Sequence, residues 1–85
     1  MKPTVLDVRG LACPLPAVKA RIALATVPPG GALLVLATDP EAPIDVAAVA
    51  ADAGCDCSCE RDGEKWRLLI ERPRLDRGRS GTLLL

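Results

Sequence analysis

The 85-residue sequence contains no histidine, no tyrosine and no phenylalanine, and Trp66 is its only aromatic residue. Without histidine, the chain cannot form Cys–His nucleophilic pairs or metal sites with imidazole ligands. With one aromatic side chain, it has no stacking platform for single-stranded nucleic acid. A core built from alanine, valine, leucine and isoleucine favours a thin two-layer structure with little room for a deep ligand cavity.

The chain also lacks net charge, because eleven basic and eleven acidic residues cancel. Overall charge therefore does not indicate nucleic acid or a membrane as an obligatory partner. No apolar run reaches the roughly 18 residues of a membrane span, and residues 1–10 lack the apolar segment of a secretory signal. We expect a cytoplasmic protein with no membrane partner, in which the four cysteines stay reduced and form no disulfide framework.

Turn residues divide the sequence into six segments in the order β-α-β-α-β-β. Strands are expected over residues 4–8, 32–37, 55–60 and 65–71, and helices are expected to begin near Pro14 and near Pro43 or Asp45. The run at 32–37 is continuously apolar, which is typical of a strand covered on both faces or nearly so. Asp62-Gly63 predicts a hairpin turn between the last two strands.

Each helix has an apolar stripe that is expected to face the sheet. The predicted stripe of the first helix consists of Leu15, Val18, Ile22 and Ala25. The predicted stripe of the second consists of Val46, Val49, Ala50 and Ala53, with Gly54 just past the helix end.

Right-handed crossovers place both helices on one side of the sheet. The expected fold class is therefore α/β, a two-layer βαβαββ sandwich with a four-stranded mixed sheet and two helices on one face. We expect one domain over residues 1–72 and a flexible C-terminal tail over residues 73–85.

Four arginines lie close to the C-terminus: Arg72, Arg74, Arg77 and Arg79. The simplest interpretation is a solvated tail. The alternative is a docking strip for an acidic partner protein or for RNA phosphates.

Cys55, Cys57 and Cys59 alternate with polar residues, so their side chains should share one face of a strand. Neighbouring cysteines would lie about 6.6 Å apart along that face, too far for the Cβ separation of about 3.8 Å in a disulfide. We expect the sulfur atoms to face inward and to pack as small apolar groups. An auxiliary sulfur-handling or metal site is the alternative.

Cys13 lies where the loop after the first strand becomes the first helix. A helix N-terminus carries about half a positive charge, so the pKa of the thiol is expected to fall. Pro14 and Pro16 stiffen the first turn but supply no N–H donors. Arg9 and Lys19 are the nearest cations in the sequence. The alternative is that Cys13 caps the helix or fills the core, as most free cysteines do.

Residues 7–16, DVRGLACPLP, resemble the signature of the TusA/SirA/YedF-like sulfur-carrier family. Thr38-Asp39-Pro40 and Asp45 match a second landmark of that family, and the resemblance covers roughly residues 4–72. The three-cysteine run and the segment from Pro73 onward depart from its pattern. The resemblance implies a two-layer βαβαββ sandwich with Cys13 as the working residue. The residues expected to support the active loop are Asp7, Arg9, Gly10, Pro14, Pro16 and Lys19.

The resemblance also implies that the protein is a sulfurtransferase acting as a carrier. Cys13 would take sulfane sulfur as a persulfide and relay it to a partner protein, with no cofactor and no metal. The donor would be a cysteine desulfurase or a rhodanese-like protein. The acceptor would serve tRNA thiolation, molybdenum-cofactor assembly or sulfur oxidation, so nucleic acid is involved only indirectly. A monomer is expected. A non-catalytic protein-binding or RNA-binding module remains the alternative.

Overall fold

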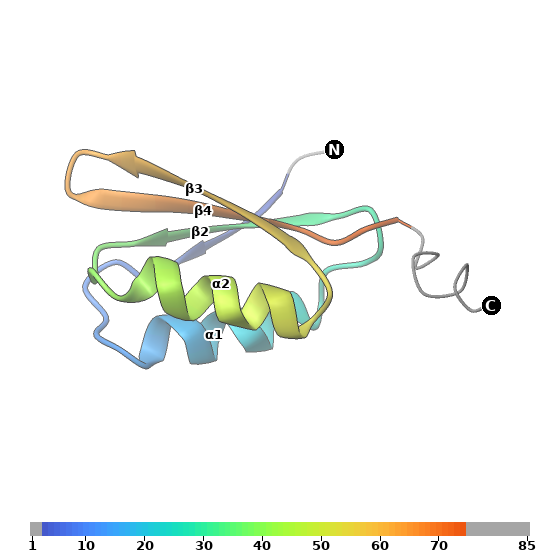
Figure 1. Cartoon of the computed structure of the whole chain (residues 1–85), viewed down its shortest axis with the longest axis horizontal. Coiled ribbons are helices and arrows are strands. Elements are labelled where there is room, and N and C mark those ends of the chain that lie inside the picture. The colour runs from blue at the N-terminus through green and yellow to red at the C-terminus, as the bar shows by residue number, and fades with distance from the viewer. Residues whose placement is uncertain (1–2, 75–85) are drawn as a thin grey trace.

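Two helices cover one face of a four-stranded sheet in the computed structural model, which describes residues 3–74 (Figure 1). The elements are β1 (Thr4–Asp7), α1 (Leu15–Leu24), β2 (Ala32–Ala37), α2 (Ala42–Asp52), β3 (Asp56–Asp62) and β4 (Lys65–Glu71). The predicted fold class and element order are confirmed. Most of the predicted tail, residues 75–85, lies outside the described residues.

The sheet has the strand order β1-β2-β4-β3, which places β2 and β4 at its centre. β1 pairs in parallel with β2, and the other two pairs are antiparallel, so the sheet is mixed as predicted. Asp62 pairs with Lys65, which leaves Gly63 and Glu64 as a two-residue turn. The predicted turn was one residue early. Gly63 takes a positive φ of 66°, which suits glycine in such a turn.

The core lies between the helices and the inner face of the two central strands. Leu33 and Val35 of β2 pair with Ile70 and Leu68 of β4, and all four side chains are fully buried. On the other face no second layer covers β2, so Leu34 remains partly exposed. The prediction that β2 is covered on both faces or nearly so was therefore correct for the inner face and wrong for the outer face, because the fold has only two layers.

The predicted inner stripe of α1 was wrong. Pro16, Ala20 and Leu24 are buried against the rest of the protein. The larger side chains of the predicted stripe are on the surface, with exposed fractions of 45% for Leu15, 45% for Val18 and 66% for Ile22; Ala25 is exposed as well. Both sets have helical spacing, so periodicity alone could not choose between them. The smaller set, with alanine at its centre, lets α1 lie close to α2 and the sheet.

The predicted inner face of α2 was correct at three of its four positions. Val46, Val49 and Ala50 are buried, while Ala53 caps the helix and is exposed. Gly54 follows with a φ of 73°, so glycine ends the helix as the sequence indicated. Among residues 3–74, neither helix is long and apolar enough to cross a membrane.

The three cysteines near β3 are not equally buried. Cys55 is buried, Cys57 is partly buried and Cys59 is exposed, and all are free thiols. β3 begins beside the end of α2 and moves away from the helices towards the hairpin turn (Figure 1). The prediction of inward packing was therefore correct for Cys55 and wrong for Cys59. Within residues 3–74, no group of three or more ligand side chains is placed to hold a metal ion.

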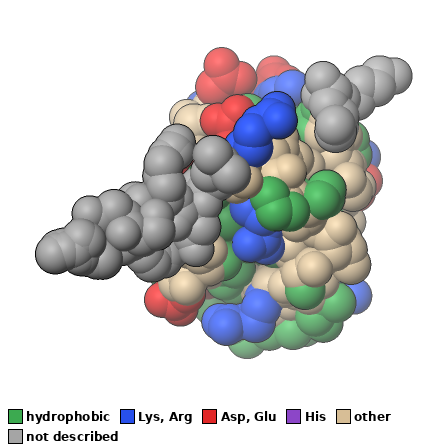
Figure 2. All heavy atoms as spheres, turned by 90° about the vertical axis from the view of Figure 1, so that its right-hand side faces the viewer, with side chains coloured by type: hydrophobic (Ala, Val, Ile, Leu, Met, Phe, Trp, Pro, Cys, Tyr) green, Lys and Arg blue, Asp and Glu red, His purple; other side chains and the backbone are tan. Residues whose placement is uncertain are grey.

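Arg72 belongs to the folded part of the chain rather than to the tail. Its guanidinium donates a 2.9 Å hydrogen bond to the carbonyl oxygen of Leu24, where the negative end of the α1 dipole lies. Its backbone N–H donates to the carbonyl of Gly31. Figure 2 views this end of the molecule, where basic side chains lie among hydrophobic ones. Arg77 and Arg79 lie outside the described residues.

Replacing Leu68 with alanine should strongly destabilise the protein, because this fully buried side chain lies on a central strand. The expected loss in free energy of unfolding is about 2–5 kcal/mol, measured by urea denaturation. Leu69→Ala is the matched control, since Leu69 lies next to it on the uncovered face and is partly exposed. Equal losses for the two variants would contradict the one-sided core.

Candidate functional site

The site lies at one edge of the sheet, where β1 and β2 end side by side. Because these strands are parallel neighbours, their carboxyl ends meet at the same edge. The N–H of Val8 extends the ladder by donating to the carbonyl of Leu36 at 2.8 Å. The loop that follows β1 carries Cys13, and the loop that follows β2 carries Thr38 and Asp39. The topology therefore brings these two loops together.

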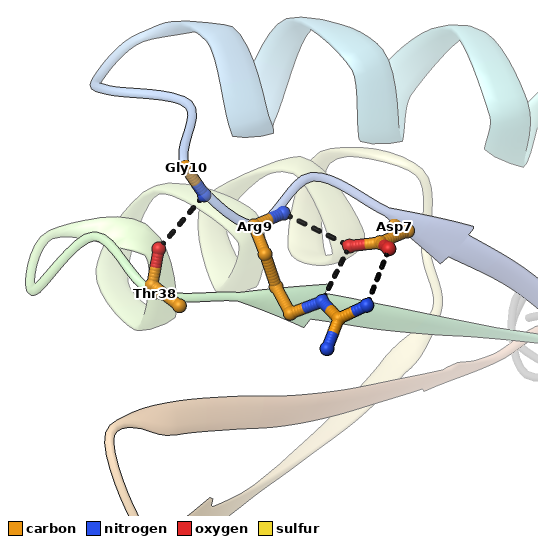
Figure 3. Close-up of polar contacts among 4 residues, drawn as sticks. All are labelled: Asp7, Arg9, Gly10 and Thr38. Atoms are coloured by element: carbon orange, nitrogen blue, oxygen red, sulfur yellow. Dashed lines mark hydrogen bonds and ion pairs between the residues drawn. The ribbon is translucent and has the colours of Figure 1, made fainter.

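Two hydrogen bonds join these loops. The N–H of Gly10 donates to Oγ1 of Thr38 at 2.9 Å (Figure 3), and the N–H of Cys13 donates to Oδ2 of Asp39 at 2.8 Å. The other oxygen of Asp39 accepts the N–H of Glu41 at 2.7 Å. The N–H groups of Glu41 and Cys13 both lower the pKa of Asp39. A single carboxylate thus fixes the backbone of Cys13 to the start of α2.

Asp7 and Arg9 form a second restraint within the Cys13 loop. Nε and Nη2 of Arg9 donate to the two carboxylate oxygens of Asp7 at 2.8 and 2.7 Å, and the backbone N–H of Arg9 also donates to Asp7. The Arg9 side chain turns back to Asp7 on the side away from α1 (Figure 3). Arg9 is therefore paired with Asp7, and it is not among the charges that shift the pKa of Cys13.

Cys13 is exposed, and its thiol donates a 3.1 Å hydrogen bond from Sγ to Oδ2 of Asp45 on the first turn of α2. This hydrogen bond raises the pKa of the Cys13 thiol, and so do desolvation and the negative charges of Asp45, Asp39 and Glu41. The predicted fall in the pKa was wrong. Three acidic groups act on the sulfur instead of cations.

Prolines and backbone pairing limit the N–H donors that the first turn of α1 offers to Cys13. Pro14 is the cap residue and α1 begins at Leu15, one residue later than predicted. The N–H of Leu15 donates to the carbonyl of Ala12, and the N–H of Val18 donates to that of Pro14. These donors are used within the backbone. Pro16 is buried under this turn and Pro14 is exposed, so the two prolines shape the loop without contributing a donor.

Lys19 is not brought to the thiol. It is exposed farther along α1, where it lines a shallow hollow with Leu6, Ile22 and Ala23. It is not among the charges that shift the pKa of Cys13. The predicted supporting residues thus lie at the end of β1, in the Cys13 loop and at the start of α1, except for Lys19, which lies farther along α1: these are Asp7, Arg9, Gly10, Pro14 and Pro16.

Sequence reasoning did not place Thr38, Asp39 or Asp45 among the site residues. In the sequence they stand out only as the second landmark of a family resemblance. The signal that could have found them is topological: residues that follow two neighbouring parallel strands meet at one sheet edge.

An exposed thiol on a restrained loop, with a carboxylate in hydrogen-bond reach, can form and break a sulfur–sulfur bond with another molecule. It can also give up its proton to that carboxylate.

The pairing of Asp7 with Arg9 should be visible in an acid titration. Hydrogen bonds from Arg9 lower the pKa of Asp7 from 3.8 to about 2. The pair's contribution to stability is then complete above pH 3.8 and is lost as the pH falls through about 2. Following the Asp7 carboxyl carbon by NMR, we expect Arg9→Gln to return the pKa towards 3.8 and Lys65→Gln to change it much less. An unchanged titration in Arg9→Gln would contradict the pairing.

Comparison with known proteins identifies relatives of this chain and a solved structure with the same fold. Two proteins of Neisseria meningitidis, from serogroups A and B, each named "Putative sulfur carrier protein", are 47% identical to this chain over 66 residues. Those alignments cover 74% of this chain and 88% of each relative.

A crystal structure of a SirA-like protein from Desulfitobacterium hafniense has the same fold, with a TM-score of 0.73 and 24% sequence identity. The superposition covers 82% of this chain and 97% of the other. The model of the sulfurtransferase TusA family matches residues 4–72, which include all six elements and the Cys13 loop. The chain therefore belongs to the TusA sulfurtransferase family.

Proposed function

We propose that the protein carries sulfane sulfur as a persulfide on Cys13 and relays it to a partner protein. The observation that supports this most directly is the exposed Cys13 thiol, which forms no disulfide and lies on a loop restrained at Gly10 and at the Cys13 backbone. A sulfur atom presented by another protein needs an accessible acceptor rather than a deep pocket. Membership of the TusA family supplies the reaction class.

In this proposal the loop residues hold Cys13 in place and do not touch the transferred sulfur. Asp7 and Arg9 brace the end of β1, and Gly10 takes a φ of 85°, a conformation that other residues rarely adopt. Pro14 and Pro16 start α1 and fix the direction of the chain after Cys13. Lys19, which is remote from the thiol, is assigned to contact with partners.

The sulfur donor is proposed to be a cysteine desulfurase or a rhodanese-like protein. The acceptor would belong to tRNA thiolation, molybdenum-cofactor assembly or sulfur oxidation. A reducing compartment such as the cytoplasm suits a carrier whose free thiol must be regenerated after each transfer.

Docking of these partners is proposed to use the exposed apolar face of α1, formed by Leu15, Val18 and Ile22. This face begins two residues after Cys13, and its side chains are between 45% and 66% exposed. Apolar side chains that reach solvent next to a reactive group are typical of a protein-interaction surface. A partner bound there would lie within reach of the thiol.

The role of Cys13 is tested by replacing it with serine, which has no thiol to accept sulfur. After incubation with a cysteine desulfurase and cysteine, intact-mass measurement should detect one added sulfur atom on the native protein and none on Cys13→Ser. Cys59→Ser is the control, because Cys59 is also an exposed free thiol. It should load normally. Loading of Cys13→Ser would refute the assignment.

The docking face is tested with Ile22→Glu, which places a charge on the most exposed apolar residue of α1. Loading by the desulfurase should slow about tenfold, the effect of losing about 1.4 kcal/mol of binding free energy. Loading by a small persulfide should not change. Val5→Glu is the matched control, since Val5 is 58% exposed on β1 rather than on α1. An equal effect of both variants would exclude a specific role for the α1 face.

A further inference from the structure

We propose that Asp45 is a catalytic residue that takes the proton of the Cys13 thiol during sulfur transfer and returns it to the leaving sulfur. The inference rests on the proposed carrier function and deepens it. Its basis is the 3.1 Å hydrogen bond from Sγ of Cys13 to Oδ2 of Asp45, which joins two residues 32 positions apart in the chain.

The surroundings of the thiol single out Asp45 among the acidic groups. Both oxygens of Asp39 already accept backbone N–H groups, from Cys13 and from Glu41. Glu41 acts on the sulfur only through its charge. Asp45 is the group within hydrogen-bond reach of Sγ, and it is half-buried on the first turn of a helix that packs into the core.

The cations near the loop do not offset these charges. Arg9 holds Asp7 in a bidentate pair, and Lys19 lines a hollow on a different part of α1. The hydrogen bond to Asp45, desolvation and the charges of Asp45, Asp39 and Glu41 raise the pKa of Cys13, which keeps the resting sulfur as a thiol. A thiol is a poor nucleophile, so its proton must leave as the new bond forms. An acceptor already hydrogen-bonded to it meets that need.

The step balances without an oxidant or a reductant from elsewhere. The donor is a persulfide, R–S–SH. Sγ of Cys13 forms a bond to the outer sulfur of the donor, and its proton passes to Asp45. The sulfur–sulfur bond of the donor breaks, its electron pair leaves with R–S⁻, and Asp45 gives the proton to this sulfur. The products are Cys13–S–SH and R–SH, and Asp45 is again a carboxylate.

The test uses Asp45→Asn and two reagents with opposite requirements. Iodoacetamide reacts with the thiolate, so its rate at Cys13 should rise about threefold or more at pH 7 when the negative charge is removed. Sulfur transfer from glutathione persulfide requires the proton of Cys13 to pass to Asp45. The rate at which one sulfur is loaded onto Cys13 should therefore fall about tenfold or more. Both rates are measured on the full chain by mass spectrometry of the Cys13 peptide.

Two further variants separate the effect of losing the proton acceptor from the effect of losing a negative charge. Glu41→Gln removes a charge that acts on the sulfur without a hydrogen bond to it, so both rates should stay level or rise. Asp45→Glu keeps a carboxylate and should recover part of the loading. Loading that is unchanged or faster in Asp45→Asn would overturn the proposal and leave Asp45 as a purely electrostatic neighbour. Loading of Cys13→Ser would instead refute the carrier function itself.

Discussion

The parallel pairing of β1 with β2 is the constraint on which the site depends. It brings the ends of both strands to one edge of the sheet, so the loop that carries Cys13 meets the segment that leads into α2. Asp39 then accepts N–H groups from both sides, which fixes the thiol near the first turn of α2. Without the pairing, Cys13 and Asp45 would have no reason to be close.

The electrostatics of the site suit a thiol that stays protonated until a partner protein binds. Carboxylates around Cys13 disfavour the thiolate, and susceptibility of a cysteine to oxidation follows its thiolate character. The hydrogen bond to Asp45, desolvation and the neighbouring negative charges all favour the protonated form of this exposed thiol. An approaching cation would offset the negative charges of Asp45, Asp39 and Glu41 without any change in the fold.

The thin core has a consequence for the surface. In this two-layer sandwich, which has no phenylalanine or tyrosine, α1 buries Ala20 and Leu24 and leaves Ile22 exposed. The larger apolar side chains of α1 are therefore left outside, next to the Cys13 loop. Burial of the smaller set of α1 side chains therefore leaves exposed the apolar face that we assign to partner binding.

The sequence by itself determined the features that depend on neighbours along the chain. These include the order of the elements, the glycine after α2, the hairpin between β3 and β4 and the position of Cys13 at the start of α1. Local backbone preferences and short periodicities set all of them. The motif at residues 7–16 also indicated the correct family, because it is a local pattern that needs no long-range contact to be read.

Only the tertiary structure decided which face of α1 is buried, how far Cys59 is exposed and in which direction the pKa of Cys13 is shifted. Each depends on groups distant in the chain. The two carboxylates bonded to Cys13 come from 26 and 32 residues away, and Cys59 is exposed because the helices cover only the start of β3. The 3.1 Å hydrogen bond to Asp45 is the largest cause of the raised pKa of Cys13, and it joins two elements that only the fold brings together.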